Sequence, residues 1–596
     1  MSAYVPPLAD IRFVLGELVG LERVSALPPH AELNDGLVDA VLDEAAKFAT
    51  GILDPLYRAG DREGARLDGH RVVLPDAVAA AYAKFVAGGW NGLEGPVEHG
   101  GQGLPHLIAV AVQELWNGAD MAFHLCPMLT SGVVEALVHH GSAEQRRAYL
   151  PKLVSGEWTG TMNLTEPQAG SDLAAIRTRA VREGDHYRIY GTKIFVTWGE
   201  HDLAGNIVHL VLARTPDAPE GVKGLSLFVV PKHLVNADGS RGARNDVRCV
   251  ALEHKLGIHG SPTCVLAFGD EGGAVGELVG EENHGLDHMF TMMNHARLGV
   301  ALQGVGIAAR ACGGAVAYAR ERVQGRPAGT RSGPPGPIIR HPDVRRMLLA
   351  MRAHTEAMRA LVYLAAFAYD SARHEPDDEA RHKSRAIADF LTPIAKGWCT
   401  EKAIEVASLG VQVHGGMGYV EETGAAQCLR DARITTIYEG TTGIQANDLV
   451  ARKVGRDGGA TARALVHDMR VLAAELARVR QADVAAIHAA FDPAVTALAG
   501  ATAWMVQAQA RDPAQAAAVA VPYLMLWGTV AGGWQMARAA LIASAKIAGK
   551  DGRSFHKTKL ATARFYAEHV LPQAGALAAE VISGAGSVLA VQPEDL

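Results

Sequence analysis

At 596 residues the chain is too long for a single hydrophobic core, and three or four domains of roughly 100–200 residues are expected. Apolar residues make up 48% of the chain and charged residues 20%, which is ordinary for a globular protein. The 57 basic and 64 acidic side chains give a net charge of −7, so the composition gives no reason to expect nucleic acid or an anionic membrane surface as a partner.

The cysteines and the first residues indicate a reduced, cytoplasmic compartment. None of the six cysteines forms a C-x-x-C pair, which argues against a zinc ribbon or a dithiol site. Residues 1–27 lack a basic segment followed by an apolar run, so no signal peptide is expected. We find no apolar run of the ~18–20 residues that a bilayer requires, and no integral membrane segment is expected.

The pattern of elements changes twice along the chain. Helical periodicity dominates up to about Trp158, although Pro127 is expected to interrupt the buried helix over 120–141. Short β-rich runs then alternate with turn residues, from Tyr187–Tyr190 and Lys193–Thr197 to Cys264–Phe268, as in a barrel or sandwich. Helical texture returns near residue 283 and continues, after a glycine-rich break, to the end of the chain.

We therefore predict a multidomain α+β protein. Its predicted parts are an N-terminal arm (1–30), an N-terminal helical domain (31–157), a middle β-barrel or sandwich domain (158–282), a C-terminal four-helix-bundle domain (283–455) and an additional C-terminal helical extension (461–596).

The most familiar catalytic signatures are missing. The sequence has no P-loop, no H-E-x-x-H, no G-x-S-x-G and no G-x-G-x-x-G between a strand and a helix. His139 and His140 are neighbours, but adjacent helical side chains point in different directions, so no metal site is expected there.

Three other segments have the composition of ligand-binding loops. Met162 to Asp172 reads M-N-L-T-E-P-Q-A-G-S-D and can present backbone N–H groups and hydroxyls, although a polar turn would look the same. Gln412 to Tyr419 reads Q-V-H-G-G-M-G-Y, whose glycines allow either a close backbone approach or a helix C-cap with a turn.

The third segment, I-Y-E-G-T-T-G-I-Q from Ile437 to Gln445, contains a candidate base. Glu439 follows apolar residues, and apolar surroundings raise the pKa of a carboxyl group towards that of a useful base. Gly440 would let a substrate approach the backbone closely. An exposed loop glutamate is the competing interpretation.

In this order, and on this helix–β–helix plan, the three segments resemble the acyl-CoA dehydrogenase family over about residues 50–455. The strings L-T-E-P-x-A-G-S-D and I-Y-E-G-T are the specific part of the resemblance. The N-terminal arm and the long helical tail are similar to those of the long bacterial members, among them a type that acts on 3-methylmercaptopropionyl-CoA.

The resemblance implies an FAD site in the middle of the chain. Its expected contacts with the flavin ring are Met162, Leu164, Thr165, Ser171, Phe195, Val196 and Thr197. Phe195 stands where the family usually has Trp, which keeps the apolar ring and loses an N–H donor. Ser171 is also expected to contact the substrate thioester.

Later residues complete the expected sites. The substrate side is expected to include Asn294, where the family usually has Asp, together with Arg297 and Gly440. Arg322 is expected to bind the flavin pyrophosphate of a neighbouring subunit, a bidentate task that suits a guanidinium. The remaining expected cofactor contacts are Gln412, Val413, His414, Gly415, Gly416 and Thr441. Gly443 replaces a residue that is often Gln, so its flavin contact is not carried over.

The resemblance also implies the reaction. Glu439 would remove the α-proton of an acyl-CoA while the β-hydrogen leaves as hydride to FAD, giving a 2-enoyl-CoA. An electron-transfer flavoprotein would reoxidise the flavin. We expect a homodimer whose substrate is a short or medium acyl-CoA or 3-methylmercaptopropionyl-CoA.

Two other functions share parts of these patterns. An acyl-CoA oxidase would carry the same motifs and pass electrons to oxygen. A flavoprotein of the alkylation-response type would bind DNA through a basic C-terminal region. Here residues 461–596 hold twelve basic and ten acidic residues, and a net charge of +2 is too small for a strong phosphate-binding surface.

Overall fold

A computed structural model describes residues 3–329, 332–549 and 552–596. The chain divides into two compact units, and each is described by itself. We call them the helical unit (Met1–Ala46, His106–Gly118 and Val300–Leu596) and the β unit (Lys47–Pro105 and Ala119–Gly299).

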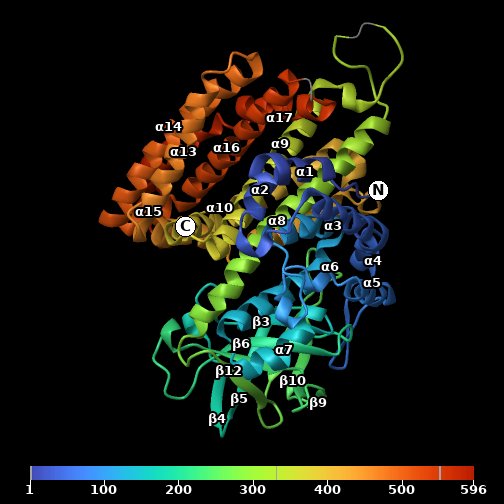
Figure 1. The fold of residues 1–596 in the computed structure, drawn as a ribbon, viewed down its shortest axis with the longest axis vertical. Helices are drawn as coiled ribbons and strands as arrows, with labels where there is room; N and C mark the ends of the chain where they lie inside the picture. The colour runs from blue at the N-terminus through green and yellow to red at the C-terminus, as the bar shows by residue number, and fades with distance from the viewer. Residues whose placement is uncertain (1–2, 330–331, 550–551) are drawn as a thin grey trace. The chain divides into compact units, whose positions relative to one another are not determined.

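The β unit is built on one eight-stranded sheet, shown in Figure 1 around the labels β3, β5, β6 and β12. Its strands are β3 (Trp158–Asn163), β4 (Arg179–Glu183), β5 (His186–Thr197), β6 (Asn206–Ala213), β7 (Ser226–Pro231), β10 (Val247–Leu252), β11 (Thr263–Phe268) and β12 (Ala274–Val279). The order is β10-β11-β5-β12-β7-β6-β3, with β4 added alongside β5. All pairs are antiparallel except β3 with β6.

The central strand β5 is longer than the sequence predicts. The two predicted runs, Tyr187–Tyr190 and Lys193–Thr197, form one strand because it has partners along its whole length. Its first half pairs with β12 and β4, and its second half, from Gly191, pairs with β11. The core of the sheet is apolar, with Ile189, Phe228 and Leu266 fully buried.

Helices and two hairpins complete the β unit. The helices are α4 (Asp54–Glu63), α5 (Asp76–Ala87), the second part of α6 (His106–His140), α7 (Ala143–Ser155) and the first part of α8 (Gly285–Glu321). The hairpins are β1 (Arg66–Asp68) with β2 (Arg71–Val73) and β8 (His233–Val235) with β9 (Arg241–Arg244). Ser142 and Gln145 form a capping box that begins α7.

The break in α6 lies at Asp120 and not at Pro127, so the prediction of an interruption at the proline was wrong. Asp120 has non-helical backbone angles (φ −156°, ψ 95°), whereas Pro127 lies inside a continuing helix. The Asp120 carboxylate accepts a hydrogen bond of 3.1 Å from the Phe123 N–H, which caps a new helical stretch. The boundary between the two units falls at the same place.

The helical unit contains two long core helices and a C-terminal set that packs on them. The core helices are α9 (Pro342–His374) and α10 (Asp378–His414). Two shorter helices follow them, α11 (Ala425–Arg433) and α12 (Thr442–Asn447). The C-terminal set is α13 (Ala460–Leu476), α14 (Ala482–Arg511), α15 (Pro513–Ala518), α16 (Ala520–Ala548), α17 (Ser554–His569), α18 (Gln573–Ser583) and α19 (Ala585–Ala590). Helix α16 packs on both α9 and α10, and the orange and red helices of Figure 1 are this set.

The N-terminal arm is held by buried charges of the helical unit. It comprises α1 (Leu8–Phe13) and α2 (Leu21–Ser25) with an intervening π-helical turn, and α3 (Asp35–Phe48) follows it. The carboxylate of Asp10 binds Arg359 of α9 at 2.5 Å and Lys559 of α17. Burial alone would raise the pKa of Asp10, but these two cations lower it. The arm and the C-terminal extension are thus tied to one core helix.

Among the residues that the structure describes, three helices are long and apolar enough to cross a membrane by length and composition alone, so the prediction that no apolar run reaches that length was wrong. They are α6, α8 and α14, whose most apolar windows are 83%, 67% and 39% buried inside the protein. The first two are therefore mostly interior helices. The element order confirms the predicted multidomain α+β class, and the exact domain boundaries stay predictions.

Candidate active site

The string after β3 forms a tight turn beside β5. The backbone groups of Glu166 and Ala169 bond to each other at 2.9 and 3.0 Å, which closes the turn. The Ile194 N–H of β5 donates to the Thr165 carbonyl at 2.9 Å, so the string and β5 lie side by side. The predicted ligand contacts Met162, Leu164 and Thr165 are half-buried, and Ser171 is exposed.

A buried ion pair fixes this string. Lys193 of β5 donates to the Glu166 carboxylate at 2.9 Å and to the Leu164 carbonyl at 2.8 Å. Glu166 also accepts from the Thr178 hydroxyl at 2.5 Å and from the Arg177 N–H at 2.7 Å. Burial alone would raise the pKa of Glu166, but Lys193 and these donors lower it to about 2, while burial lowers the pKa of Lys193 to about 8.

The end of β5 has an unusual backbone. Phe195 (φ 57°) and Trp198 (φ 54°) lie in the left-handed region, which is rare for bulky residues and occurs at functional sites. The Phe195 ring is 57% exposed, whereas Trp198 is buried and donates from Nε1 to the Ala122 carbonyl at 3.1 Å. Val196 is buried in the sheet core, so only its backbone can face a ligand, and Thr197 is half-buried.

The expected substrate residues Asn294 and Arg297 lie together on α8. Arg297 is only 3% exposed and donates from Nη1 to the Asn294 side-chain oxygen at 3.3 Å. Its guanidinium also lies 5.9 Å from the Phe290 ring centre. Asn294 is half-buried and therefore accessible from the surface of the β unit.

In the helical unit, Glu439 lies on a strained turn between a 3₁₀ turn (Ile434–Thr436) and α12. Glu439 (φ 56°) and Gly440 (φ 91°) are both in the left-handed region, and Glu439 is half-buried. The preceding Tyr438 hydroxyl donates to Gln303 of α8. Burial and then the charge of Glu439 raise the pKa of Tyr438. Thr441, which is exposed, caps α12 by accepting from the Ile444 N–H at 3.3 Å.

Two buried side chains bind the carbonyls of this turn. Lys396 of α10 donates from Nζ to the Gly440 carbonyl at 2.6 Å. Gln445 of α12 donates from Nε2 to the Glu439 carbonyl at 3.0 Å and to the Gly440 carbonyl at 3.3 Å. Both Lys396 and Gln445 are fully buried.

The glycine string at the end of α10 leaves open backbone. Gly415 has φ 61° and ψ −143° and ends the helix, and no described atom lies within 4 Å of a Cβ built on Gly415 or Gly416. His414 stacks on Tyr318 with ring centres 4.4 Å apart. The His414 Nδ1 donates to the Gly410 carbonyl at 2.7 Å, so Nε2 remains as an acceptor, and burial lowers the His414 pKa.

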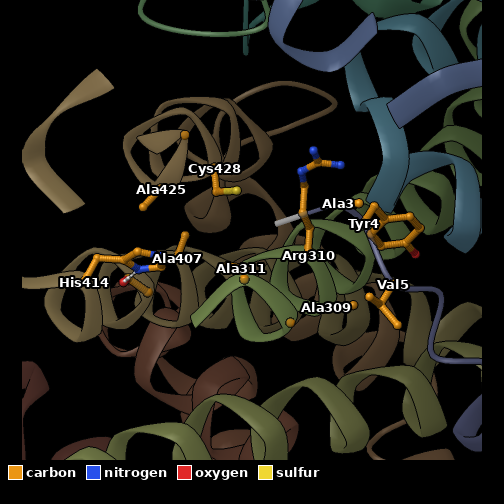
Figure 2. A pocket seen from close by; sticks show the side chains of 14 residues that line it. Ala3, Tyr4, Val5, Ala309, Arg310, Ala311, Ala407, His414, Ala425 and Cys428 are labelled. Atoms are coloured by element: carbon orange, nitrogen blue, oxygen red, sulfur yellow. Dashed lines mark hydrogen bonds between the residues drawn. The ribbon is translucent and has the colours of Figure 1, made fainter. Parts of the chain in front are cut away.

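Figure 2 shows the small pocket of the helical unit that His414 lines. Tyr4 and Val5 of the arm and Arg310 of α8 line it as well, together with Cys428 of α11. Of the other predicted contacts, Gln412 is exposed and Val413 is buried. The guanidinium of Arg322, just after α8, is exposed, while its backbone is held by the Tyr318 carbonyl and the Ile338 N–H.

These features fit FAD. In the β unit, an exposed aromatic ring and nearby hydroxyls match a flat ring system with polar edges. In the helical unit, the open backbone at Gly415 and Gly416 leaves room for a phosphate to approach, and the exposed Arg322 can bind one. The predicted site residues are divided between the two units. The β unit holds Met162 to Arg297, and the helical unit holds Arg322 to Thr441.

Sequence reasoning missed Lys396, Gln445, Glu166 and Lys193 as parts of the site. A signal for Lys396 existed, because it is the only charged residue of the ten from Phe390 to Cys399. Lys193 gave no such signal, since its partner lies 27 residues earlier and alternating strands often carry lysine.

Family comparisons cover nearly the whole chain. The acyl-CoA dehydrogenase N-terminal domain matches residues 38–157, the middle domain 161–270 and the C-terminal domain 283–454. The family described as "Acetyl-CoA dehydrogenase C-terminal like" matches residues 465–592.

Several relatives match along nearly the whole chain. The chain is 50% identical to 3-methylmercaptopropionyl-CoA dehydrogenase of Ruegeria pomeroyi, over 98% of this chain and 99% of the relative. It is 33% identical to a butyryl-CoA dehydrogenase of Syntrophomonas wolfei, over 96% and 95%. The solved structure of a Bacillus anthracis acyl-CoA dehydrogenase complexed with FAD has a TM-score of 0.74 at 22% identity, covering 94% of this chain and 91% of that one. The family resemblance read from the sequence motifs is confirmed.

Proposed function

This chain belongs to the acyl-CoA dehydrogenase family, and from that premise we propose that Glu439 is its catalytic base and that its substrate is a short- or medium-chain acyl-CoA, with 3-methylmercaptopropionyl-CoA as the first candidate. Family membership makes it an FAD-dependent oxidoreductase that acts on the CH–CH group of acyl-CoA thioesters. The observation that carries the proposal is the position of Glu439 on a strained turn whose two carbonyls are bound by buried side chains.

The proposed step is removal of the α-proton. The thioester carbonyl acidifies this proton, and the Glu439 carboxylate accepts it at one of its oxygens. FAD, when bound, supplies the acceptor for the hydride that leaves the β-carbon. The protein holds the carboxylate at a fixed place, and the neighbouring Tyr438, whose pKa is raised, stays neutral beside it. The organic product is the 2-enoyl-CoA.

We assign the cofactor contacts in two groups. Met162, Leu164, Thr165, Ser171, Phe195, the Val196 backbone and Thr197 would face the flavin ring. Thr441 would also touch the flavin, and the segment Gln412–Gly416 would line the same pyrophosphate that Arg322 binds. Arg322 would reach the pyrophosphate of the neighbouring subunit, so the enzyme would be a homodimer with one flavin per chain.

The substrate assignment rests on the relatives and on an apolar helix. Residues 122–129 of α6, the expected acyl lining, are all buried, and burial lowers the pKa of His124 to about 3, so that its ring is neutral at pH 7. A thioether sulfur is apolar and about the size of a methylene group, so such a pocket suits both 3-methylmercaptopropionyl and butyryl chains. Asn294, Arg297 and Gly440 would contact the substrate.

The proposal extends to partner and compartment. We propose an electron-transfer flavoprotein as the acceptor that reoxidises the enzyme. We place the enzyme in the cytoplasm, because its six cysteines are free thiols and five of them are buried.

The test of the base is Glu439→Gln. The amide keeps the shape of the side chain but accepts no proton, so turnover should fall about 100- to 10,000-fold while FAD stays bound. Glu475→Gln, an exposed glutamate on α13, is the matched control and should turn over normally. Near-normal turnover of flavin-loaded Glu439→Gln would refute the assignment.

The test of the substrate is kcat/KM measured with a dye acceptor across acyl chains of rising length and the thioether substrate. Apolar pockets discriminate by only ~1–3 kcal/mol per methylene, so a broad optimum over short chains is expected. A clear optimum at long-chain acyl-CoA would refute the substrate assignment and leave the chemistry at Glu439 untouched.

A further inference from the structure

We propose that Lys396 is a positioning residue for the dehydrogenation, because its buried ammonium fixes the turn that carries Glu439. This inference rests on the proposed role of Glu439 as the base. Lys396 would transfer no proton and touch no substrate. It would act through the turn, by the hydrogen bond from its Nζ to the Gly440 carbonyl, 2.6 Å away.

The surroundings of Lys396 show why this contact matters. The side chain is fully buried on α10, in a stretch from Phe390 to Cys399 that is otherwise uncharged. A buried ammonium is strongly disfavoured unless it donates hydrogen bonds, and a charge-assisted bond to a carbonyl is stronger than a neutral one. An apolar residue of similar length could fill the same space but could not donate this bond, so the bond is what distinguishes lysine at this position.

The turn itself needs such a constraint. Glu439 has a left-handed backbone (φ 56°), which is unfavourable for a residue with a Cβ, and Gly440 (φ 91°) follows it. Gln445 donates to both carbonyls of the turn, at 3.0 and 3.3 Å, and Lys396 binds the second of them as well. Two consecutive peptide groups are therefore held by two buried side chains from two helices, which fixes the direction in which the Glu439 side chain leaves the backbone.

Close packing keeps Lys396 from moving. The next residue on α10, Gly397, is so near α16 that a Cβ there would lie 2.8 Å from the Leu524 side chain. At Gly528 of α16, a Cβ would lie 2.1 Å from the Trp398 ring. The segment that carries Lys396 is thus pressed against the C-terminal extension, and the extension supports the catalytic turn through α10.

The rate of proton transfer depends strongly on the exact position of the base. A shift of about 1 Å in a catalytic group can cost about 100-fold in rate without changing how the substrate binds. Loss of the lysine should consequently appear in kcat rather than in KM or in cofactor content.

The experiment compares Lys396→Met with the flavin-loaded full-length protein. We expect FAD content and KM within about twofold of the unmodified enzyme and kcat lower by about 100-fold. Lys402→Met is the matched control, since Lys402 is a buried lysine on the same helix that pairs with Glu405 at 2.8 Å and does not contact the turn. It should keep normal kcat. Normal kcat in flavin-loaded Lys396→Met would overturn the inference.

A double variant separates this inference from the assignment of the base. If Lys396 acts through Glu439, the residual rate of Glu439→Gln should not fall further when Lys396→Met is added. A further large fall would overturn the positioning role, and normal turnover of Glu439→Gln would instead overturn the proposed function. If Lys396→Met does not fold, Gln445→Met removes the other side chain that binds the carbonyls of the turn. A lower kcat with unchanged KM supports the inference, and an unchanged kcat overturns it.

Discussion

The ammonium of Lys193 lies 2.9 Å from the carboxylate of Glu166 and 2.8 Å from the Leu164 carbonyl, in the interior of the β unit. One cation thus joins the middle of β5 to the string after β3. Both segments carry residues that we assign to the flavin ring. The ion pair therefore fixes the position of the string after β3 relative to β5. Breaking a buried pair from one side leaves an uncompensated charge, which is far more costly than losing an exposed pair.

The first prediction concerns Lys193→Met. The variant leaves the buried Glu166 without its cation, and we expect a loss of about 3–5 kcal/mol in the free energy of unfolding together with weaker retention of FAD. Thermal melts and the flavin-to-protein ratio after desalting measure both effects. Arg71→Met, which breaks the exposed pair between Arg71 and Asp202, is the control and should change little. Equal melts and flavin ratios for the two variants would contradict the prediction.

The second prediction is a pH dependence at Glu166. Its pKa is lowered to about 2 in the fold from an ordinary value near 4.5, so the folded state binds its proton less readily than the unfolded chain does. The group therefore stabilises the protein above about pH 4.5 and loses this contribution as pH falls towards 2. Melting temperatures of the unmodified protein and of Glu166→Gln should differ at pH 7 and approach each other below pH 4.5. A difference that stays constant down to pH 3 would speak against this linkage.

The third prediction concerns the arm. Lys559 of α17 binds Asp10 of the arm and, at 2.6 Å, Glu356 of α9, and all three side chains are buried. Lys559→Met should cost about 3–5 kcal/mol in stability and release the arm, so that a protease cuts within residues 1–27 first. Lys546→Met is the control, because its partner Glu17 and Lys546 itself are both more than a third exposed. An arm equally protected in both variants would disprove the role of the buried lysine.

Sequence motifs identified the family and supplied the candidate base, because each motif is a contiguous string whose chemistry does not depend on distant contacts. The supports of those motifs could not be found in this way. Lys396 meets Gly440 from 44 residues away, and nothing local to either residue indicates the other. The sequence also did not predict the left-handed backbone of Phe195, since bulky residues disfavour that conformation.

The fold likewise has features that the sequence patterns did not predict. The sequence predicted two strands separated near Gly191, because a glycine often marks a turn. In the structure Gly191 pairs with β11, and β5 continues through it as one strand. In the sequence, Pro127 predicts a helix break more strongly than Asp120 does. In the structure, the break lies at Asp120, whose carboxylate caps the second stretch of α6. The strand that pairs with Gly191 comes from a distant part of the chain, so local patterns miss it, whereas the Asp120 cap is local.

The fourth prediction tests whether Arg322 serves the flavin of the partner subunit. In the proposed dimer, each site combines Glu439 of one chain with Arg322 of the other. A dimer of Arg322→Ala chains should bind FAD poorly, and a dimer of Glu439→Gln chains should turn over slowly. In a mixed dimer, one site has both replacements and the other has neither.

Coexpression of the two variants with different affinity tags should therefore restore activity. Random pairing of equal amounts gives half mixed dimers, each with one intact site, so about a quarter of the unmodified activity is expected. Coexpression of two differently tagged Glu439→Gln chains is the control and should stay at the low rate. If Arg322 instead binds the flavin of its own chain, no combination contains an intact site and the mixed preparation stays inactive. A flavin-loaded monomer in light scattering would exclude the exchange of residues between subunits altogether.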